Sequence, residues 1–141
     1  MKKLLVLPLF LLASGASAAC KPTVSDAWLR LAPGGMGMAA GFFRIENPCK
    51  SPVELNAATS KSFRSVSIHQ TVVANGVSRM RHLPTMTLAS RDRALFQPGG
   101  LHIMLMQPVK PVNVGQRIPV TISGPGWSVT TSFVVKSAIA P

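Results

Sequence analysis

The spacing of Pro, Gly and Asn along the chain is what most constrains its fold. From Val24 onward these residues separate short segments of mixed apolar and polar character, and none of the segments has the periodicity of an amphipathic helix. Short strands with regular turn signals between them are typical of a β-sandwich or barrel. The sequence therefore predicts an all-β fold, with turns at residues 33–35, 75–76, 98–100 and 124–126.

The runs between the turn signals are the predicted strands. No linker or internal repeat separates them, so a single domain is expected. We expect strands at residues 27–31, 40–46, 53–58, 66–73, 77–82, 94–96, 102–106, 118–122 and 128–135.

An Asn-Gly pair at residues 75–76 lies between two of these runs and predicts a two-residue type I′ hairpin. A loop of this kind fixes the pairing, with His69 opposite His82 and Thr71 opposite Met80. Met80 then becomes a diagonal neighbour of His69 on one face of the hairpin. Diagonal neighbours lie roughly 7–8 Å apart, close enough for two long side chains to share an ion.

A second His/Met pair is predicted on the strand at residues 102–106. Alternation sends His102, Met104 and Met106 to one face and the intervening residues to the other. Thioether sulfur selects Cu(I) over zinc, magnesium or calcium, and imidazole tolerates it. The two pairs therefore favour a soft monovalent ion, and the set lacks the thiolate of an electron-transferring blue-copper centre.

The N-terminus has the features of a secretory signal. Lys2 and Lys3 precede a short apolar run and an Ala-x-Ala segment, which predicts a signal peptide at residues 1–18, cleaved near Ala18. Residues 19–141 form the mature domain, and the loss of Lys2 and Lys3 lowers the net charge from +11 to +9. The scattered basic residues and the export signal exclude nucleic acid as a partner. The remaining positive charge is either an ordinary solvated basic surface or a source of weak attraction to an anionic membrane surface or an acidic protein, and the sequence leaves both interpretations open.

Export also bears on the two cysteines. In an oxidising compartment Cys20 and Cys49 are expected to form a disulfide. Lipidation of Cys20 is the alternative, but Ser17 stands where a lipoprotein signal normally has leucine.

The arrangement His69, ten residues, Met80, twenty-one residues, His102, one residue, Met104 resembles the signature of the PCu(A)C family of periplasmic copper chaperones. Residues 27–28, 75–81 and 98–106 are also similar to family segments. The resemblance implies a cupredoxin-like Greek-key β-barrel or sandwich in which His69, Met80, His102 and Met104 hold one Cu(I) per monomer. It further implies delivery of copper to an acceptor, the Cu(A) site of a cytochrome c oxidase subunit or another copper chaperone, by a monomeric periplasmic protein.

Other hypotheses remain open. Copper sequestration would use the same residues, and a structural exported β-domain would use none of them as ligands. An enzyme is not expected, because the chain has four acidic residues and no tyrosine. His82 is either an auxiliary ligand or a hydrogen-bonding surface residue, and Met36 and Met38 form either a second soft patch or an ordinary loop. The sequence leaves the choice between Cu(I) and Cu(II) in the cell open.

Overall fold

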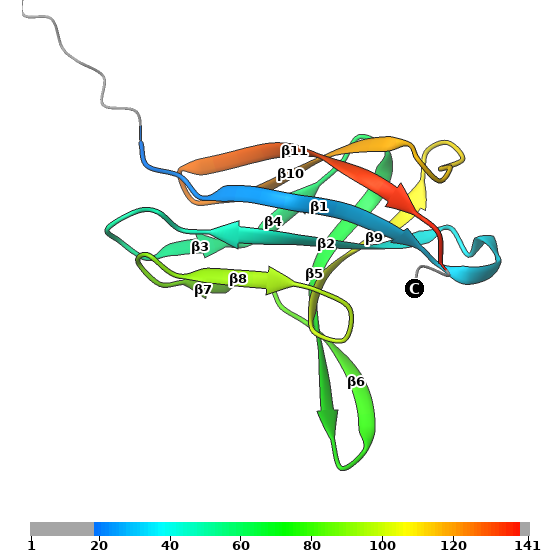
Figure 1. Cartoon of the computed structure of the whole chain (residues 1–141), viewed down its shortest axis with the longest axis horizontal. Coiled ribbons are helices and arrows are strands. Elements are labelled where there is room, and N and C mark those ends of the chain that lie inside the picture. Colours follow the sequence, from blue (N-terminus) through cyan, green and yellow to red (C-terminus); the bar gives the residue numbers. More distant parts are fainter. Residues whose placement is uncertain (1–18, 139–141) are drawn as a thin grey trace, which may run out of the picture.

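The computed structural model describes residues 19–138 and is shown in Figure 1. The predicted signal peptide, residues 1–18, lies outside the described residues, so its cleavage remains a prediction. The described chain holds eleven strands and one short 3-10 helix, and none of its helices is long and apolar enough to cross a membrane. The elements are β1 Thr23–Leu31, η1 Pro33–Gly35, β2 Met38–Glu46, β3 Val53–Leu55, β4 Ala57–Thr59, β5 Phe63–Ala74, β6 Val77–His82, β7 Met86–Leu88, β8 Arg93–Phe96, β9 Leu101–Pro108, β10 Arg117–Gly124 and β11 Trp127–Lys136.

Nine of the strands form one sheet in the order β4-β10-β11-β1-β2-β8-β9-β5-β6, and β3 pairs with β7. Most neighbours are antiparallel, whereas β1 with β11 and β8 with β9 are parallel. The sheet folds over into two layers, and the β5–β6 hairpin projects from the body (Figure 1). The predicted all-β, cupredoxin-like fold is confirmed in its sandwich form, since the sheet does not close into a barrel.

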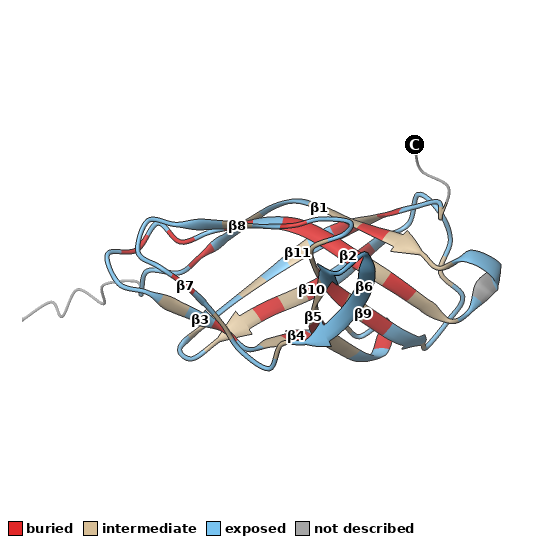
Figure 2. Ribbon diagram, turned by 90° about the horizontal axis from the view of Figure 1, so that it is seen from below, coloured by how far each residue is buried: buried red, intermediate tan, exposed pale blue. Residues whose placement is uncertain are grey.

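The core lies between the two layers (Figure 2). Phe43 stacks on Phe96 with ring centroids 4.1 Å apart and meets the edge of Phe133 at 5.7 Å. On β9, Ile103 and Leu105 are fully buried, as the predicted alternation requires. Because these two side chains fill the core, the residues between and beside them on β9 face the other side of the sheet.

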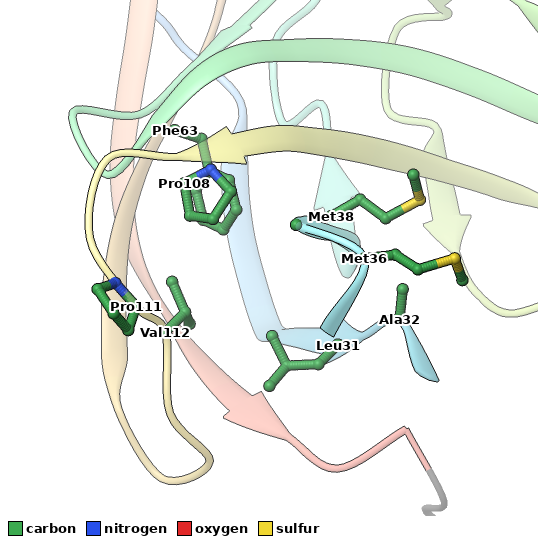
Figure 3. Close-up of a pocket in the computed structure, with 9 residues that line it drawn as sticks. Leu31, Ala32, Met36, Met38, Phe63, Pro108, Pro111 and Val112 are labelled. Atoms are coloured by element: carbon green, nitrogen blue, oxygen red, sulfur yellow. The ribbon is translucent and has the colours of Figure 1, made fainter. Parts of the chain in front are cut away.

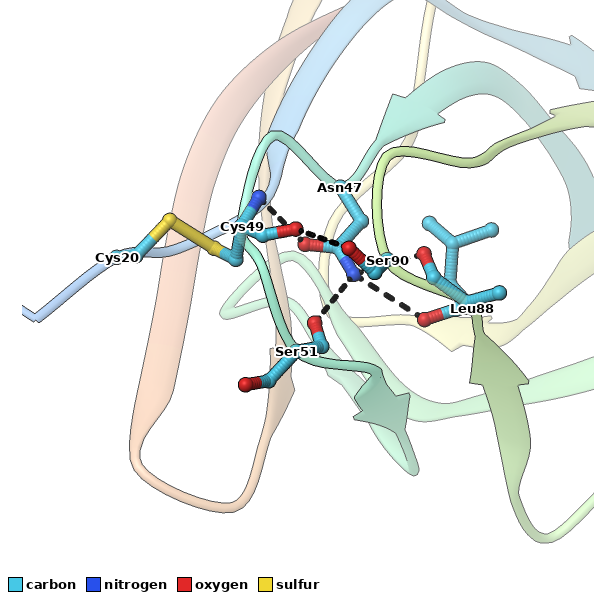
Figure 4. The surroundings of a disulfide bond; sticks show 7 residues. Cys20, Asn47, Cys49, Ser51, Leu88 and Ser90 are labelled. Atoms are coloured by element: carbon cyan, nitrogen blue, oxygen red, sulfur yellow. Dashed lines mark hydrogen bonds between the residues drawn. A yellow bond between two sulfur atoms is a disulfide. The ribbon is translucent and has the colours of Figure 1, made fainter.

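The predicted bridge between Cys20 and Cys49 is present, with Cα atoms 5.7 Å apart (Figure 4). It ties the start of the described chain to the turn after β2. The buried Asn47 organises this turn, because its side-chain amide donates to the carbonyls of Ser51 and Ala89 and its oxygen accepts from the Cys49 amide. Sulfur of Cys20 is thus committed to a disulfide in this structure.

The predicted strand at 77–82 is observed with those bounds, and most others differ at their ends. The predicted strand at 53–58 is wrong as one element, because β3 and β4 belong to different sheets. Leu55 and Ala58 are both buried, three residues apart, so the alternation breaks between them. Asn56 marks the switch, since its amide donates to Ser123 on β10. Strand β7 was not predicted.

Candidate metal centre

The β5–β6 hairpin has the predicted register. His69 faces His82 and Thr71 faces Met80, while Asn75 and Gly76 adopt φ angles of 51° and 74°. Both turn residues are therefore in the left-handed region, as a type I′ turn requires. Every residue of β6 is exposed. Met80, a diagonal neighbour of His69, accordingly sits on an arm that solvent reaches freely.

Strand β9 borders β5 on its other side and brings the second His/Met pair to the same place. His69 faces His102, and Ser67 faces Met104. The imidazoles of His82, His69 and His102 consequently form one row across three strands, with ring centroids 5.4 and 5.9 Å apart. The structure thus gathers the four predicted ligands around His69, which has Met80 as its diagonal neighbour on β6 and Met104 on β9.

His102 is held in a defined orientation. Its side chain is 5% exposed, and its Nδ1 lies 3.0 Å from the Gly100 carbonyl. A carbonyl oxygen only accepts, so Nδ1 carries a proton and donates, and in the neutral imidazole Nε2 then has a free lone pair. The Thr71 amide donates to the same carbonyl. The turn at residues 98–100 thereby fixes the imidazole in the form that binds a metal.

His69 is positioned by its own strand. The Ser67 hydroxyl oxygen lies 2.9 Å from Nε2 of His69. The other ring nitrogen, Nδ1, is buried and has no hydrogen-bond partner among the described residues. When Ser67 accepts from the Nε2 proton, Nδ1 presents a lone pair. Leaving a buried polar atom unpaired costs about 1–3 kcal/mol. A metal ion bound to Nδ1 would satisfy it, so the donor set fits the metal that the sequence predicts.

The protonation state of His69 suits the same role. Burial lowers the pKa of His69 below its usual 6.5, and the positive charges that His102 and His82 can carry lower it further. Only the neutral imidazole donates a lone pair to a metal. His69 is therefore ready to bind a metal at neutral pH without first losing a proton.

The donors differ in how far solvent reaches them. Met80 is 53% exposed, Met104 is half-buried, and His82 is exposed. Across residues 19–138 no three His, Cys, Asp or Glu side chains are placed together to hold a metal ion. Both cysteines are in the disulfide. What surrounds His69 is thus a mixed set of imidazoles and thioethers, from which a soft monovalent ion would draw both nitrogen and sulfur.

Sequence reasoning missed the residues that orient the two histidines. Ser67 and Gly100 each lie two residues before the histidine that they contact, but the sequence pattern does not show that they hydrogen-bond to its ring. Phe42 was also missed, and its ring centroid lies 6.4 Å from that of His102. The ring centroids of Phe42 and Trp28 are 4.6 Å apart, so a pair of packed aromatic rings lies beside the site. The Ala27-Trp28 segment was the sequence signal for it.

Comparison with known proteins identifies relatives that match most of the described residues. The model of the family described as putative lipoprotein LpqE-like matches residues 22–132. The putative lipoprotein Lxx21020 of Leifsonia xyli subsp. xyli is 35% identical over 100 residues, which are 70% of this chain and 59% of that protein. The chain thus spans less than two thirds of that relative.

Solved structures of PCuAC domains have the same fold. The apo PCuAC domain of PmoF2 is 26% identical with a TM-score of 0.70, over 87% of this chain and 95% of that one. The copper-bound PmoF2 domain is 24% identical with a TM-score of 0.69, over 86% and 97%. Cu(I)-bound DR1885 from Deinococcus radiodurans is 24% identical with a TM-score of 0.68, over 89% and 85%. The chain has the PCuAC fold and belongs to the LpqE-like family.

Proposed function

We propose that this protein binds one Cu(I) ion through His69, Met80, His102 and Met104 and hands it to another protein outside the cytoplasm. The observation that carries the proposal is the position of β5 between β6 and β9. This position brings together two His/Met pairs that are far apart in the sequence. Each imidazole uses one nitrogen in a hydrogen bond, and its other nitrogen is available to a metal. Two imidazoles and two thioethers form a neutral donor set suited to Cu(I).

The solved relatives support the choice of metal. PmoF2 has a PCuAC domain solved with copper bound, and DR1885 was solved with Cu(I). The structural likeness to those proteins covers more than four fifths of this chain. This chain has the same fold, and His69 and His102 each have a ring nitrogen available to a metal. We therefore assign copper as its cargo.

The site is built to release its ion as well as to hold it. His102 is buried and tied to Gly100, whereas Met80 lies on the projecting hairpin and is 53% exposed. An incoming protein therefore reaches Met80 first. Exchange of Met80 for a donor of the acceptor would begin the transfer, and the two imidazoles would hold the ion until the acceptor supplies more ligands.

We further propose the Cu(A) site of a cytochrome c oxidase subunit as the destination, reached directly or through another copper chaperone, with transfer in the periplasm. The resemblance of the His/Met spacing to PCu(A)C chaperones supports this destination. The charge supports an acidic acceptor: among residues 55–91 there is no acidic residue, and the projecting hairpin carries Arg79 and Arg81. Opposite charges speed the encounter of two proteins.

The test is Cu(I) binding to residues 19–141 under anaerobic conditions, in competition with a chromogenic chelator and with a reductant that is not a thiol. We expect one Cu(I) held tightly by the wild type and lost by Met80→Leu/Met104→Leu. Met86→Leu is the matched control, because Met86 lies on β7 and packs against the core. Equal binding by the wild type and the double variant would overturn the site.

A second step separates delivery from sequestration. The copper-loaded protein is mixed with the soluble Cu(A) domain of an oxidase, or with another periplasmic copper chaperone, and the copper content of each is measured after separation. Delivery predicts transfer to one of them faster than release to buffer. Retention of copper by this protein in each of the two mixtures would favour sequestration.

A further inference from the structure

Methionines outside the proposed site lie together on the same face of the sheet. Met38 on β2 faces Met106 on β9, and Ala40 faces Met104 one pair further along. Partners on antiparallel strands point to the same face, and so do residues two apart. The side chains of Met38, Met104 and Met106 thus share the face on which His102 lies.

Two cavities connect Met38 with Met104 and with Met36. One of about 310 Å³ is lined by both Met38 and Met104. Another of about 300 Å³ is lined by Met36 and Met38, whose side chains run beside each other in the same direction (Figure 3). Met36 is 61% exposed and Met106 is 37% exposed. Met86 differs, since it packs against the core cluster. We call Met36, Met38 and Met106 the methionine patch.

We propose that the methionine patch is a second, weaker site for a soft monovalent metal ion, Cu(I) or Ag(I). This inference rests on the proposed function, because it treats Met104 as a ligand of the first site. Directly opposed residues such as Met38 and Met106 have Cβ atoms about 4.5–5.5 Å apart, so two thioethers reach one ion. Met36 supplies a third sulfur from the loop before β2.

The chemistry of the patch selects the kind of ion. Its donors are thioethers, which prefer Cu(I) and bind hard divalent ions poorly. It lacks imidazole, so a bound ion is held less tightly than at His69 and His102. Met104 lines a cavity with Met38 and is also the diagonal neighbour of His69. It therefore connects the two sites, and an ion captured at the exposed patch has sulfur ligands along the face up to His69.

The experiment is an Ag(I) titration of residues 19–141 carrying ¹³C-methyl methionine, followed by NMR. We expect the first equivalent to shift the methyl signals of Met80 and Met104. Further silver should shift those of the methionine patch and leave Met86 unmoved. The Met36→Leu/Met38→Leu/Met106→Leu variant should lose the second step and keep the first, and Met86→Leu should keep both.

A His69→Ala/His102→Ala variant distinguishes failure of the patch from failure of the main site. We expect this variant to lose the first step while silver still shifts the methyl signals of the patch. Patch signals that stay unmoved at saturating silver, in this variant and in the wild type, would overturn the second site. A wild type that shows only the patch step would overturn the proposed function and leave the second site standing.

Discussion

His69 and His102 face each other across β5 and β9, with ring centroids 5.9 Å apart and planes inclined by 21°. Each ring uses one nitrogen in a hydrogen bond, Nε2 of His69 with Ser67 and Nδ1 of His102 with Gly100. Nδ1 of His69 and Nε2 of His102 are therefore the nitrogens available to a metal. The metal affinity should accordingly depend on these hydrogen bonds as well as on the ligands themselves.

Replacing Ser67 with alanine tests the hydrogen bond that orients His69. Without the hydroxyl, Nε2 of His69 loses its partner and the ring is free to change tautomer and orientation. We expect Ser67→Ala to weaken Cu(I) binding by about 10–100-fold, the usual effect of removing a partner of a metal-binding histidine. The free energy of unfolding of the metal-free protein should change little. The measurement is chelator competition, paired with chemical denaturation.

The control for Ser67→Ala is Ser128→Ala, because Ser128 is exposed on β11 and lies outside the site. It should bind copper as the wild type does. An unchanged Cu(I) affinity in Ser67→Ala would show that the Ser67 hydrogen bond does not orient His69.

The metal-free protein should titrate His69 at a pH below 6.5, because burial and the neighbouring histidines disfavour its charged form. The unfolded chain then binds a proton at His69 at higher pH than the folded chain does, so protonation favours unfolding. The contribution of neutral His69 to the free energy of unfolding is therefore complete above about pH 6.5 and is lost as pH falls through the lowered pKa. NMR titration of the His69 ring measures the pKa directly, and denaturation as a function of pH gives the linked loss.

A variant separates the causes of this shift. His82→Ala removes one of the positive charges that lower the pKa of His69, so it should raise that pKa while burial keeps it below 6.5. A higher pKa of His69 means that protons compete with copper at higher pH, so the pH at which the metal is displaced should also be higher in the variant. A pKa of His69 at or above 6.5 in the wild type would contradict the expected role of burial.

Removal of the disulfide should reduce stability without affecting copper binding. Cys20 and Cys49 are 29 residues apart, and a loop of that size restricts the unfolded chain by about 3–4 kcal/mol. The bridge lies beyond the Glu46 end of β2, whereas Met104 borders β2 at Ala40. The Cys20→Ser/Cys49→Ser variant should therefore unfold at lower denaturant and bind Cu(I) as the wild type does. A large loss of Cu(I) affinity in the folded variant would show that the bridge shapes the site.

The sequence predicted the local half of the site and not the long-range half. The Asn75-Gly76 turn fixes the β5–β6 register by itself, so the relation of His69 to Met80 follows from a few neighbouring residues. The relation of His69 to His102 depends on which strand borders β5, and single-sequence patterns hold no information on that. The family spacing supplied the connection, while the roles of Ser67 and Gly100 appeared only in the structure.

Strand β7 and the buried Asn47 show the same limit in the fold. Three residues are too few for alternation to be recognised, and Met86–Leu88 is a strand because β3 lies beside it. Asn47 reads as a turn residue before Pro48, and in the sequence it has no evident partner. Its importance arises from segments about 40 residues away, since Nδ2 donates to Leu88 and Ala89.

Asn47→Ala should therefore be among the more destabilising polar substitutions in the chain. Its amide donates to the carbonyls of Ser51, Leu88 and Ala89, and the contact with Leu88 is buried. Alanine removes this donor, which predicts a loss of about 2–4 kcal/mol in unfolding free energy. Exposed Asn113 provides the control, and Asn113→Ala should shift stability by less than about 0.5 kcal/mol. Chemical denaturation of oxidised protein measures both. Copper binding of folded Asn47→Ala should be unchanged, because Asn47 lies at the end of β2 away from Ala40 and Met104. A decrease in unfolding free energy as small as that of Asn113→Ala would mean that water replaces the Asn47 amide.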